Sequence, residues 1–201
     1  MKKVGLYFGS FNPIHVGHLV IANHFANVTE LNEIWFVVSP QNPLKKKASL
    51  LADNHRLTLV REAVADNNKL RASNIEFDLP KPSYTVYTLQ LLKEKYPDHQ
   101  FSLIMGEDNL RTLHKWKNYE YILENYDIYV YPRVFGIDEA REWQQADNDF
   151  IDRPNVHYEF DAPVMKVSSS YIRQAIKNKR DVRYLLTEPV FKYLDEMNFY
   201  K

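Results

Sequence analysis

GSFNPIHVGH, residues 9–18, follows directly on the short apolar run VGLYF at residues 4–8. An apolar run, a turn of small and turn-forming residues, and then helical spacing predict a strand that leads through a tight turn into a helix. The N–H groups of such a turn and of the helix start bind phosphate. The stretch therefore predicts a phosphate cradle between a strand and a helix.

His15 and His18 stand three residues apart in this stretch. If the helix begins near Pro13 or Ile14, both side chains project from one face, toward the carboxyl end of the strand. An imidazole can donate a hydrogen bond to a phosphate oxygen and stabilise the charge that builds on it during a reaction. Gly17 leaves room for a ligand to approach closely. The pair indicates phosphoryl or nucleotidyl transfer.

Three other interpretations of these histidines are a helix-capping turn, core histidines and a metal pair. Zinc would need a third ligand and a glutamate base, which the turn does not supply. The combination of strand, Gly-Ser, Pro and spaced histidines favours phosphate chemistry.

The chain has 201 residues, of which 45% are hydrophobic, and we expect a single domain over residues 1–201. Lysine plus arginine and aspartate plus glutamate number 26 each, so the formal net charge is zero. This balance argues against general attraction to nucleic acid or to an anionic membrane. There is no cysteine, hence no disulfide or thiol chemistry. Because neither a signal peptide nor a bilayer-length apolar run is evident, we expect a cytoplasmic protein.

Apolar runs rich in β-branched and aromatic residues alternate with segments of helical periodicity. This alternation predicts an α/β fold, a Rossmann-like doubly wound parallel sheet with ligands outside the carboxyl ends of the strands at the switch point. The expected strands are residues 4–8, 33–38, 70–75, 101–105, 128–131 and 156–158, and the expected helices are residues 16–26, 54–65, 85–95, 119–124, 141–146 and 189–199. Residues 135–163 are the least regular part of the chain, and we interpret them as a surface insertion.

VSSSYIR, residues 167–173, forms a second candidate phosphate site far along the chain. Serines before a helical stretch supply an N-cap, backbone N–H groups and hydroxyls, and Arg173 adds charged donors. Together they indicate a polyphosphate clamp, with an ordinary capped surface helix as the alternative.

Both stretches resemble motifs of one superfamily. GSFNPIHVGH resembles the HxGH signature of the nucleotidyltransferases, and its GSFNPIH form is most similar to the bacterial nicotinate mononucleotide adenylyltransferases. VSSSYIR resembles the ISSTxIR motif, with Val167 and Ser170 at its first and fourth positions. The resemblance implies a nucleotidyltransferase-type fold, catalytic roles for His15, His18 and Arg173, and ATP binding by Gly9, Ser10, Phe11, His15, His18, Gly106, Asp108, Ser168, Ser169 and Arg173.

GEDNL, residues 106–110, closes an expected strand, and a glycine followed by a carboxylate suits a ribose. Asp108 matches the aspartate of the family's GxDxL-like motif; magnesium ligation and helix capping are the alternatives. Trp116 by itself would indicate a core or interface residue. The resemblance makes it the platform that stacks on the pyridine ring of the mononucleotide.

PSYTVYTL, residues 82–89, resembles the family's SYT motif at a helix start. Ser83 and Thr85 can cap this helix, and its N–H groups favour a negative ligand, so a nicotinate carboxylate suits it better than a neutral amide. Tyr84 completes the motif. Tyr87 stands where the family commonly has aspartate, and different supporting contacts are expected there.

Two further segments carry basic candidates for substrate binding. SPQNPLKKK, residues 39–47, follows the second strand, and its lysines could reach phosphates, although such a run is often a solvated loop. Leu44 stands where the family often has histidine, which leaves Lys45 as the better candidate. Arg133 occupies a position similar to that of the arginine in the family's R-P-G turn, although Phe135 replaces the glycine. Two roles are open for Arg133: contact with a phosphate, or an ion pair on the surface.

We therefore expect adenylyl transfer from ATP to nicotinate mononucleotide, with release of pyrophosphate and formation of nicotinate adenine dinucleotide. Asn12 joins Lys45, Ser83, Tyr84, Thr85, Trp116 and Arg133 as the expected substrate-binding set. Mg²⁺ is expected on the ATP phosphates, with no protein metal site, no nucleic acid and no membrane as partners. The aromatic segment 119–131 leaves a homo-oligomer open. The alternatives are another nucleotidyltransferase such as phosphopantetheine adenylyltransferase, or a nucleotide-binding regulatory module without turnover.

Overall fold

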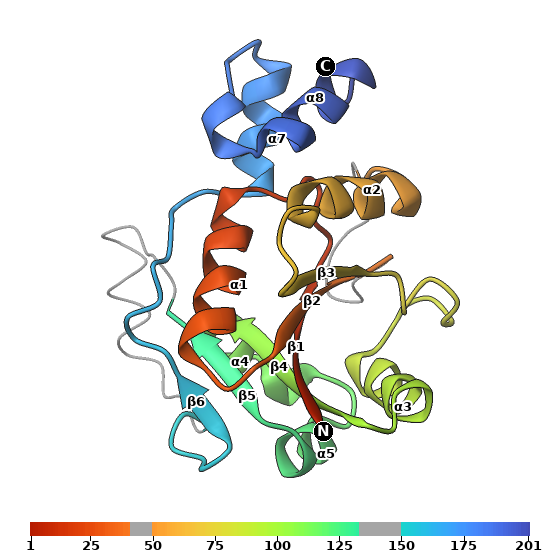
Figure 1. Ribbon diagram of the computed structural model, residues 1–201, viewed down its shortest axis with the longest axis vertical. Helices are drawn as coiled ribbons and strands as arrows, with labels where there is room; N and C mark the ends of the chain where they lie inside the picture. Colours follow the sequence, from red (N-terminus) through yellow and green to blue (C-terminus); the bar gives the residue numbers. More distant parts are fainter. Residues whose placement is uncertain (41–49, 133–149) are drawn as a thin grey trace.

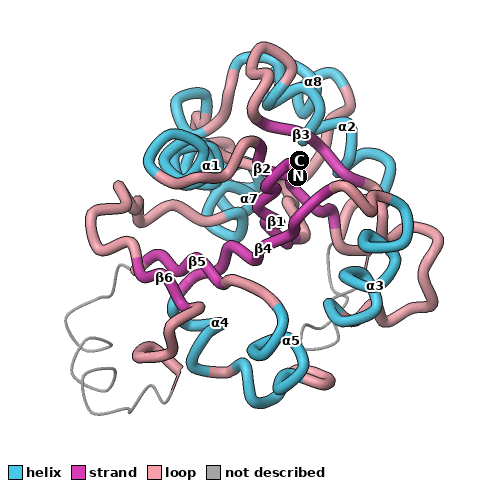
Figure 2. The backbone as a smooth tube through the Cα atoms, turned by 60° about the horizontal axis from the view of Figure 1, so that its bottom comes forward, coloured by secondary structure: helices cyan, strands magenta, loops and turns pink. Residues whose placement is uncertain are grey.

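The computed structural model describes residues 1–40, 50–132 and 150–201. Six parallel strands form one sheet in the order β3-β2-β1-β4-β5-β6, which confirms the predicted doubly wound α/β fold (Figures 1 and 2). The strands are β1 (Lys2–Gly9), β2 (Glu33–Val38), β3 (Leu70–Ser73), β4 (His99–Gly106), β5 (Ile128–Tyr131) and β6 (Val156–Tyr158).

Helices cover both faces of this sheet, as Figure 2 shows. The α-helices are α1 (Val16–Val28), α2 (Asp53–Val64), α3 (Thr85–Lys95), α4 (Glu107–Arg111), α5 (Tyr119–Asn125), α7 (Ser169–Lys177) and α8 (Glu188–Glu196), with 3₁₀ turns η1 (Leu113–Lys115) and η2 (Arg183–Leu185). α1, α2, α7 and α8 lie on one side, and α3, α4 and α5 on the other. None of the helices described is long and apolar enough to cross a membrane.

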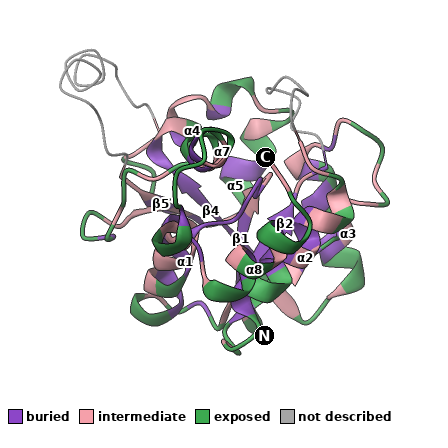
Figure 3. Ribbon diagram, turned by 90° about the horizontal axis from the view of Figure 1, so that it is seen from above, coloured by how far each residue is buried: buried purple, intermediate pink, exposed green. Residues whose placement is uncertain are grey.

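The strands are apolar throughout because each face packs on its own core. On β2, Ile34 and Phe36 face the α1 and α2 side, whereas Trp35 and Val37 face the α3 side. This alternation follows from the two-residue period of a strand. Figure 3 shows the strands as the most buried part of the molecule.

Some predicted boundaries are wrong, for identifiable reasons. The third strand ends at Ser73, not at residue 75, because Asn74 begins a turn in which the Phe77 N–H donates to the Asn74 carbonyl. β1 begins at Lys2 because its backbone pairs with His99 at the start of β4, whatever the polarity of the side chain. β6 lies within the predicted surface insertion but pairs with β5, so that part belongs to the sheet. The helix expected at residues 141–146 lies outside the described residues.

β1 and β4 are neighbours at the centre of the sheet, and the chain leaves them toward opposite faces. From β1 it continues into α1, and from β4 into α4. The loops diverge at the carboxyl ends of these two strands, which is where a doubly wound sheet forms its ligand crevice. α7 also begins near this end of the sheet (Figure 1).

Candidate active site

A cavity of about 700 Å³ lies at the carboxyl ends of β1 and β4. Residues predicted from stretches far apart in the sequence line it together. They are Gly9, Ser10, Phe11, Asn12, His15, His18, Gly106, Asp108, Trp116, Ser168, Ser169 and Arg173. Its size is typical of a small-molecule site.

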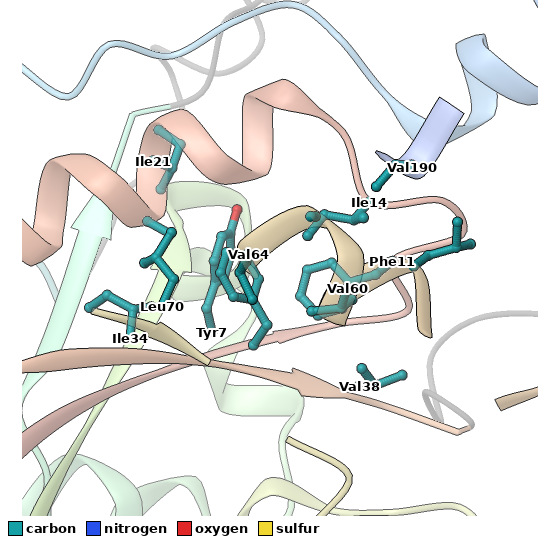
Figure 4. Close-up of a cluster of buried hydrophobic side chains, with 14 of the residues drawn as sticks. Tyr7, Phe11, Ile14, Ile21, Ile34, Val38, Val60, Val64, Leu70 and Val190 are labelled. Carbon is teal, nitrogen blue, oxygen red and sulfur yellow. The ribbon is translucent and has the colours of Figure 1, made fainter. Parts of the chain in front are cut away.

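The two histidines lie at the start of α1, whose first residue is the predicted one, although a start near Pro13 or Ile14 is not seen. The helix begins at Val16, so His15 is the N-cap residue and His18 is in the first turn. The chain turns at Asn12 and Pro13, Ile14 is fully buried in the core, and His15 is extended (Figure 4). The two imidazole rings are stacked, with centroids 3.7 Å apart.

A hydrogen bond defines which nitrogen of His18 can donate. The backbone N–H of His15 donates to His18 Nδ1 over 3.2 Å. Because Nδ1 is the acceptor, the proton of the neutral ring resides on Nε2. His18 can therefore present an N–H to an anion in the cavity.

His15 is more deeply buried, and this burial lowers its pKa to about 4. The ring is therefore neutral at physiological pH, and its Nδ1 has no hydrogen-bond partner in the described part of the chain. This nitrogen is closed off from solvent at the start of α1, 3.2 Å from the position of a Cβ on Gly17, so it does not itself face the cavity.

Gly17 does not leave room for a ligand, contrary to the sequence prediction. A Cβ added there would lie 2.7 Å from Val167 Cγ1 and 3.2 Å from His15 Nδ1. The space beside Gly17 is filled by the side chain that opens the second motif, so this glycine allows the two motifs to pack together.

In the loop between β1 and α1, three backbone carbonyl groups accept hydrogen bonds from side chains of other segments. Arg56 Nη1 donates to the Ser10 carbonyl over 2.6 Å, Arg173 Nη1 to the Asn12 carbonyl over 2.8 Å, and Ser169 Oγ to the Pro13 carbonyl over 2.8 Å. Since these acceptors are occupied, the loop offers mainly N–H donors to a ligand. Ser169 and Arg173 thus tie the second motif to the first.

Ser168 is the N-cap of α7, as predicted. Its hydroxyl accepts from the Tyr171 N–H over 3.2 Å, and it can still donate its own proton. Ser168, Ser169 and Ser170 at the start of α7 line the cavity together with Arg173.

Sequence reasoning missed Arg56. Its side chain is fully buried, and besides Ser10 it donates to the carbonyls of Leu51 and Ser39 and to Asp53. The available signal was its place on the apolar face of α2, three or four residues before Leu59 and Val60. A charged residue in that position must have buried partners.

Gly106 and Asp108 lie together at the end of β4. A Cβ at Gly106 would be 2.6 Å from Asp108 Oδ1, so the carboxylate folds over the glycine. The Tyr131 ring lies beside them, and its hydroxyl is 3.0 Å from that of Tyr7. Next to Asp108, Glu107 accepts from Arg111 and Tyr158, so its role is structural.

The SYT stretch differs from its prediction. Ser83 does not cap α3; its buried hydroxyl donates to Glu76 Oε2 over 2.8 Å, and Thr88 donates to Glu76 Oε1 over 2.7 Å. Tyr84 is the N-cap and makes no side-chain capping bond, and Thr85 is the first helical residue. Ser83, Tyr84 and Thr85 are not among the residues that line the cavity.

Trp116 connects the cavity to this helix start. Its Nε1 is buried and has no partner among the residues described. The next residue, Lys117, places its ammonium 4.8 Å from the ring centroids of both Tyr84 and Tyr87. Tyr87 is therefore a contact of Lys117. Lys45, Leu44, Arg133 and Phe135, for which the sequence also made predictions, lie outside the described residues.

Comparisons with known proteins identify the family. A model described as Cytidylyltransferase-like matches residues 6–175. Relatives from Flavobacterium johnsoniae and Christiangramia forsetii are 56% and 52% identical, over 99% and 100% of this chain and 99% of each relative. Both are named "Probable nicotinate-nucleotide adenylyltransferase". This chain belongs to the nicotinate-nucleotide adenylyltransferase family.

Solved structures agree with the fold of this adenylyltransferase family. Plasmodium falciparum nicotinic acid mononucleotide adenylyltransferase, complexed with NaAD, matches with a TM-score of 0.77 at 21% identity, over 100% of this chain and 98% of that one. The relatives support the expected adenylyltransferase and neither alternative, whether phosphopantetheine adenylyltransferase or a regulatory module.

Proposed function

We propose that this chain catalyses attack by the 5′-phosphate of nicotinate mononucleotide on the α-phosphorus of ATP, giving nicotinate adenine dinucleotide and pyrophosphate. The observation that carries this proposal is that two phosphate-binding stretches, residues 9–18 and 167–173, line one cavity and are hydrogen-bonded to each other. Membership of the adenylyltransferase family supports the same reaction.

The chemistry requires no general base, because the attacking phosphate is already ionised at neutral pH. Catalysis then consists of aligning two anions and stabilising the charge that develops on the α-phosphate and on the leaving pyrophosphate. A site that offers N–H donors while its carbonyls are occupied suits that task. Such donors replace the water that would otherwise solvate the two like charges.

Each donor has a proposed position along the triphosphate. His18 stabilises the α-phosphate through Nε2–H, and neutral His15 donates to a neighbouring phosphate. Ser168, Ser169 and the N–H groups of α7 bind the leaving pyrophosphate together with Arg173. Arg173 keeps its full charge there while Nη1 is bonded to the Asn12 carbonyl.

The ribose of ATP and the pyridine ring of the mononucleotide contact other residues than the phosphates do. Asp108 accepts from the ribose hydroxyls of ATP beside Gly106. Trp116, which lines the cavity, stacks on the pyridine ring. The carboxylate extends past this lining to the N–H groups at the start of α3, with Lys117 close by. Lys45 and Arg133 remain proposed phosphate contacts.

Mg²⁺ enters with ATP in this proposal. Asp108 is the carboxylate among the described residues that line the cavity, and a single carboxylate fits an ion that keeps phosphate oxygens and water as ligands. When bound, the ion supplies further neutralisation of phosphate charge. We also propose that the enzyme acts in the cytoplasm.

The test is a pyrophosphate-release assay with ATP and a panel of acceptors, with products identified by mass. We expect turnover with nicotinate mononucleotide, less with nicotinamide mononucleotide, and none with phosphopantetheine. Equal efficiency with both mononucleotides would contradict the carboxylate site at α3. ATP binding without pyrophosphate release would contradict the enzyme assignment.

A further inference from the structure

Tyr200 reaches the phosphate-binding loop from the far end of the chain. Its hydroxyl lies 2.5 Å from Asn12 Oδ1, although 188 residues separate the two positions. Sequence reasoning assigned Tyr200 no role. Asn12 lies at the turn of the loop, and its carbonyl is the one that Arg173 holds.

The direction of this hydrogen bond follows from its neighbours. Asn12 Oδ1 also accepts the backbone N–H of Leu51 over 3.2 Å. A backbone N–H can only donate, so the atom that faces it is the carbonyl oxygen, and Tyr200 must donate as well. The two donors together fix the orientation of the Asn12 carboxamide.

The Tyr200 hydroxyl keeps its proton under working conditions. Burial raises its pKa well above the usual value for tyrosine, outweighing the opposing effect of Arg173 and Arg56. The hydroxyl is therefore a constant donor to Asn12 at neutral pH.

The segment that carries Tyr200 is packed against the loop from the same side as α8. Val190 of α8 lies near Ile14 in the core cluster (Figure 4). Phe199, next to Tyr200, packs edge-on against His55 of α2, with ring centroids 4.9 Å apart, and His55 also bonds Tyr193 of α8 over 2.9 Å. Tyr200 is thus held in place by the contacts of Phe199, His55 and Tyr193, which we call the platform.

We propose that Tyr200 is a positioning residue for adenylyl transfer, acting through Asn12. Arg173 holds the main chain of Asn12 and Tyr200 holds its side chain, so the turn that leads to His15 and His18 has one geometry. This inference rests on the proposed function. Small displacements of groups that align reactants cost large factors in rate.

Tyr200→Phe tests it, because the ring and its packing stay while the donor is lost. We expect kcat per folded enzyme to fall about tenfold, the size of one lost hydrogen bond to a positioned group. Tyr193→Phe is the matched control, since it removes a phenol hydroxyl from the same platform without touching the loop. Its kcat should stay within about twofold of wild type. Equal kcat values for the two variants would overturn the proposal.

A double-mutant cycle with Asn12→Ala separates positioning from a merely structural role. If Tyr200 acts through Asn12, Tyr200→Phe costs little further kcat once Asn12 is alanine. Full additivity of the two losses in kcat would overturn the proposal, as would a Tyr200→Phe variant that lowers the melting temperature but keeps the wild-type kcat.

The wild-type enzyme is assayed alongside, so that the proposed adenylyl transfer and the positioning role of Tyr200 are tested independently. Absence of transfer in the wild type contradicts the proposed function, whereas wild-type transfer with an unaffected Tyr200→Phe contradicts only the role of Tyr200. Should Tyr200→Phe not fold, Tyr200→His retains a ring N–H donor. A kcat near wild type then supports the proposal, and a folded variant with a tenfold loss overturns it.

Discussion

The proposed triphosphate site, here the phosphate end, and the proposed carboxylate site at the start of α3, here the pyridine end, are supported in opposite ways. At the phosphate end, residues 9–18 have their carbonyls held by donors that include two guanidinium groups. At the pyridine end, the hydroxyls of Ser83 and Thr88 donate to the buried carboxylate of Glu76 below the start of α3. Positive groups support one end, and a negative group supports the other.

Both arrangements leave backbone N–H groups for the ligand, but their electrostatic effects differ. The charge of Arg56 is offset by its ion pair with Asp53, whereas Arg173, which lines the cavity, attracts a polyanion in addition to shaping the loop. The Glu76 carboxylate opposes an anion, and the ammonium of Lys117, held over Tyr84 and Tyr87, offsets it. We infer that the phosphate end is built for several negative charges and the pyridine end for a single one.

The largest expected effect comes from removing a support at the phosphate end. Arg56→Met leaves the carbonyls of Ser10, Ser39 and Leu51 without their buried donor. We expect a loss of about 3 kcal/mol in the free energy of unfolding, measured by urea denaturation. Arg61→Met, on the exposed side of the same helix, is the control and should change little. A similar small effect for Arg56→Met would show that the loop does not depend on it.

Next in size is the loss of a donor that meets the reacting phosphate. His18→Ala should lower kcat on the order of a hundredfold while the protein stays folded, because one N–H donor to the developing charge is gone. Pyrophosphate release at saturating substrates measures it. His24→Ala, six residues along in α1, should retain the wild-type kcat, and a near-wild-type rate for His18→Ala would contradict the assigned role.

A smaller and more selective effect is expected at the pyridine end. Ser83→Ala removes one of the hydroxyl donors of Glu76 and loosens the start of α3. We expect KM for nicotinate mononucleotide to rise about tenfold, with KM for ATP within about twofold. Thr58→Ala, which removes a hydroxyl bonded to Asn54 in α2, serves as control. An equal rise in both KM values would mean that the two ends are not supported independently.

The smallest effect concerns protons at His15. Its pKa in the folded chain is about 4, so between pH 6.5 and pH 4 the unfolded chain binds a proton that the folded chain does not. This residue therefore lowers the stability of the fold as the pH falls through that window, and His15→Gln should remove its part of the decline. NMR titration of the ring should give a midpoint near 4, which rises when tripolyphosphate binds. A midpoint near 6.5 in the free protein would contradict its burial.

These tests also mark the boundary of what the sequence could predict. The strands and the doubly wound class of the sheet followed from apolar periodicity and the crossover rule, whereas the order of the strands was seen only in the structure. The residues around the phosphates followed from two local stretches. The apolar periodicity of an element and the residue pattern of a phosphate-site stretch are each contained within about a dozen neighbouring residues.

The supports behind the site could not be predicted in this way. Tyr200 meets Asn12 across 188 positions, and Ser169 meets Pro13 across 156. Gly17 was assigned to a ligand but packs on Val167, and Ser83 was assigned to a helix cap but bonds Glu76. Each of these partners is set by tertiary packing, which a local pattern does not encode.

The central claim is that the histidines stabilise charge on a phosphorus that is attacked directly, without a covalent enzyme intermediate. The stereochemical course of the reaction with ATP chirally substituted by sulfur at the α-phosphorus tests it. A single in-line displacement predicts inversion at that phosphorus in the dinucleotide product. Retention would require two displacements, with His15, His18 or another group as a nucleophile, and would contradict the account.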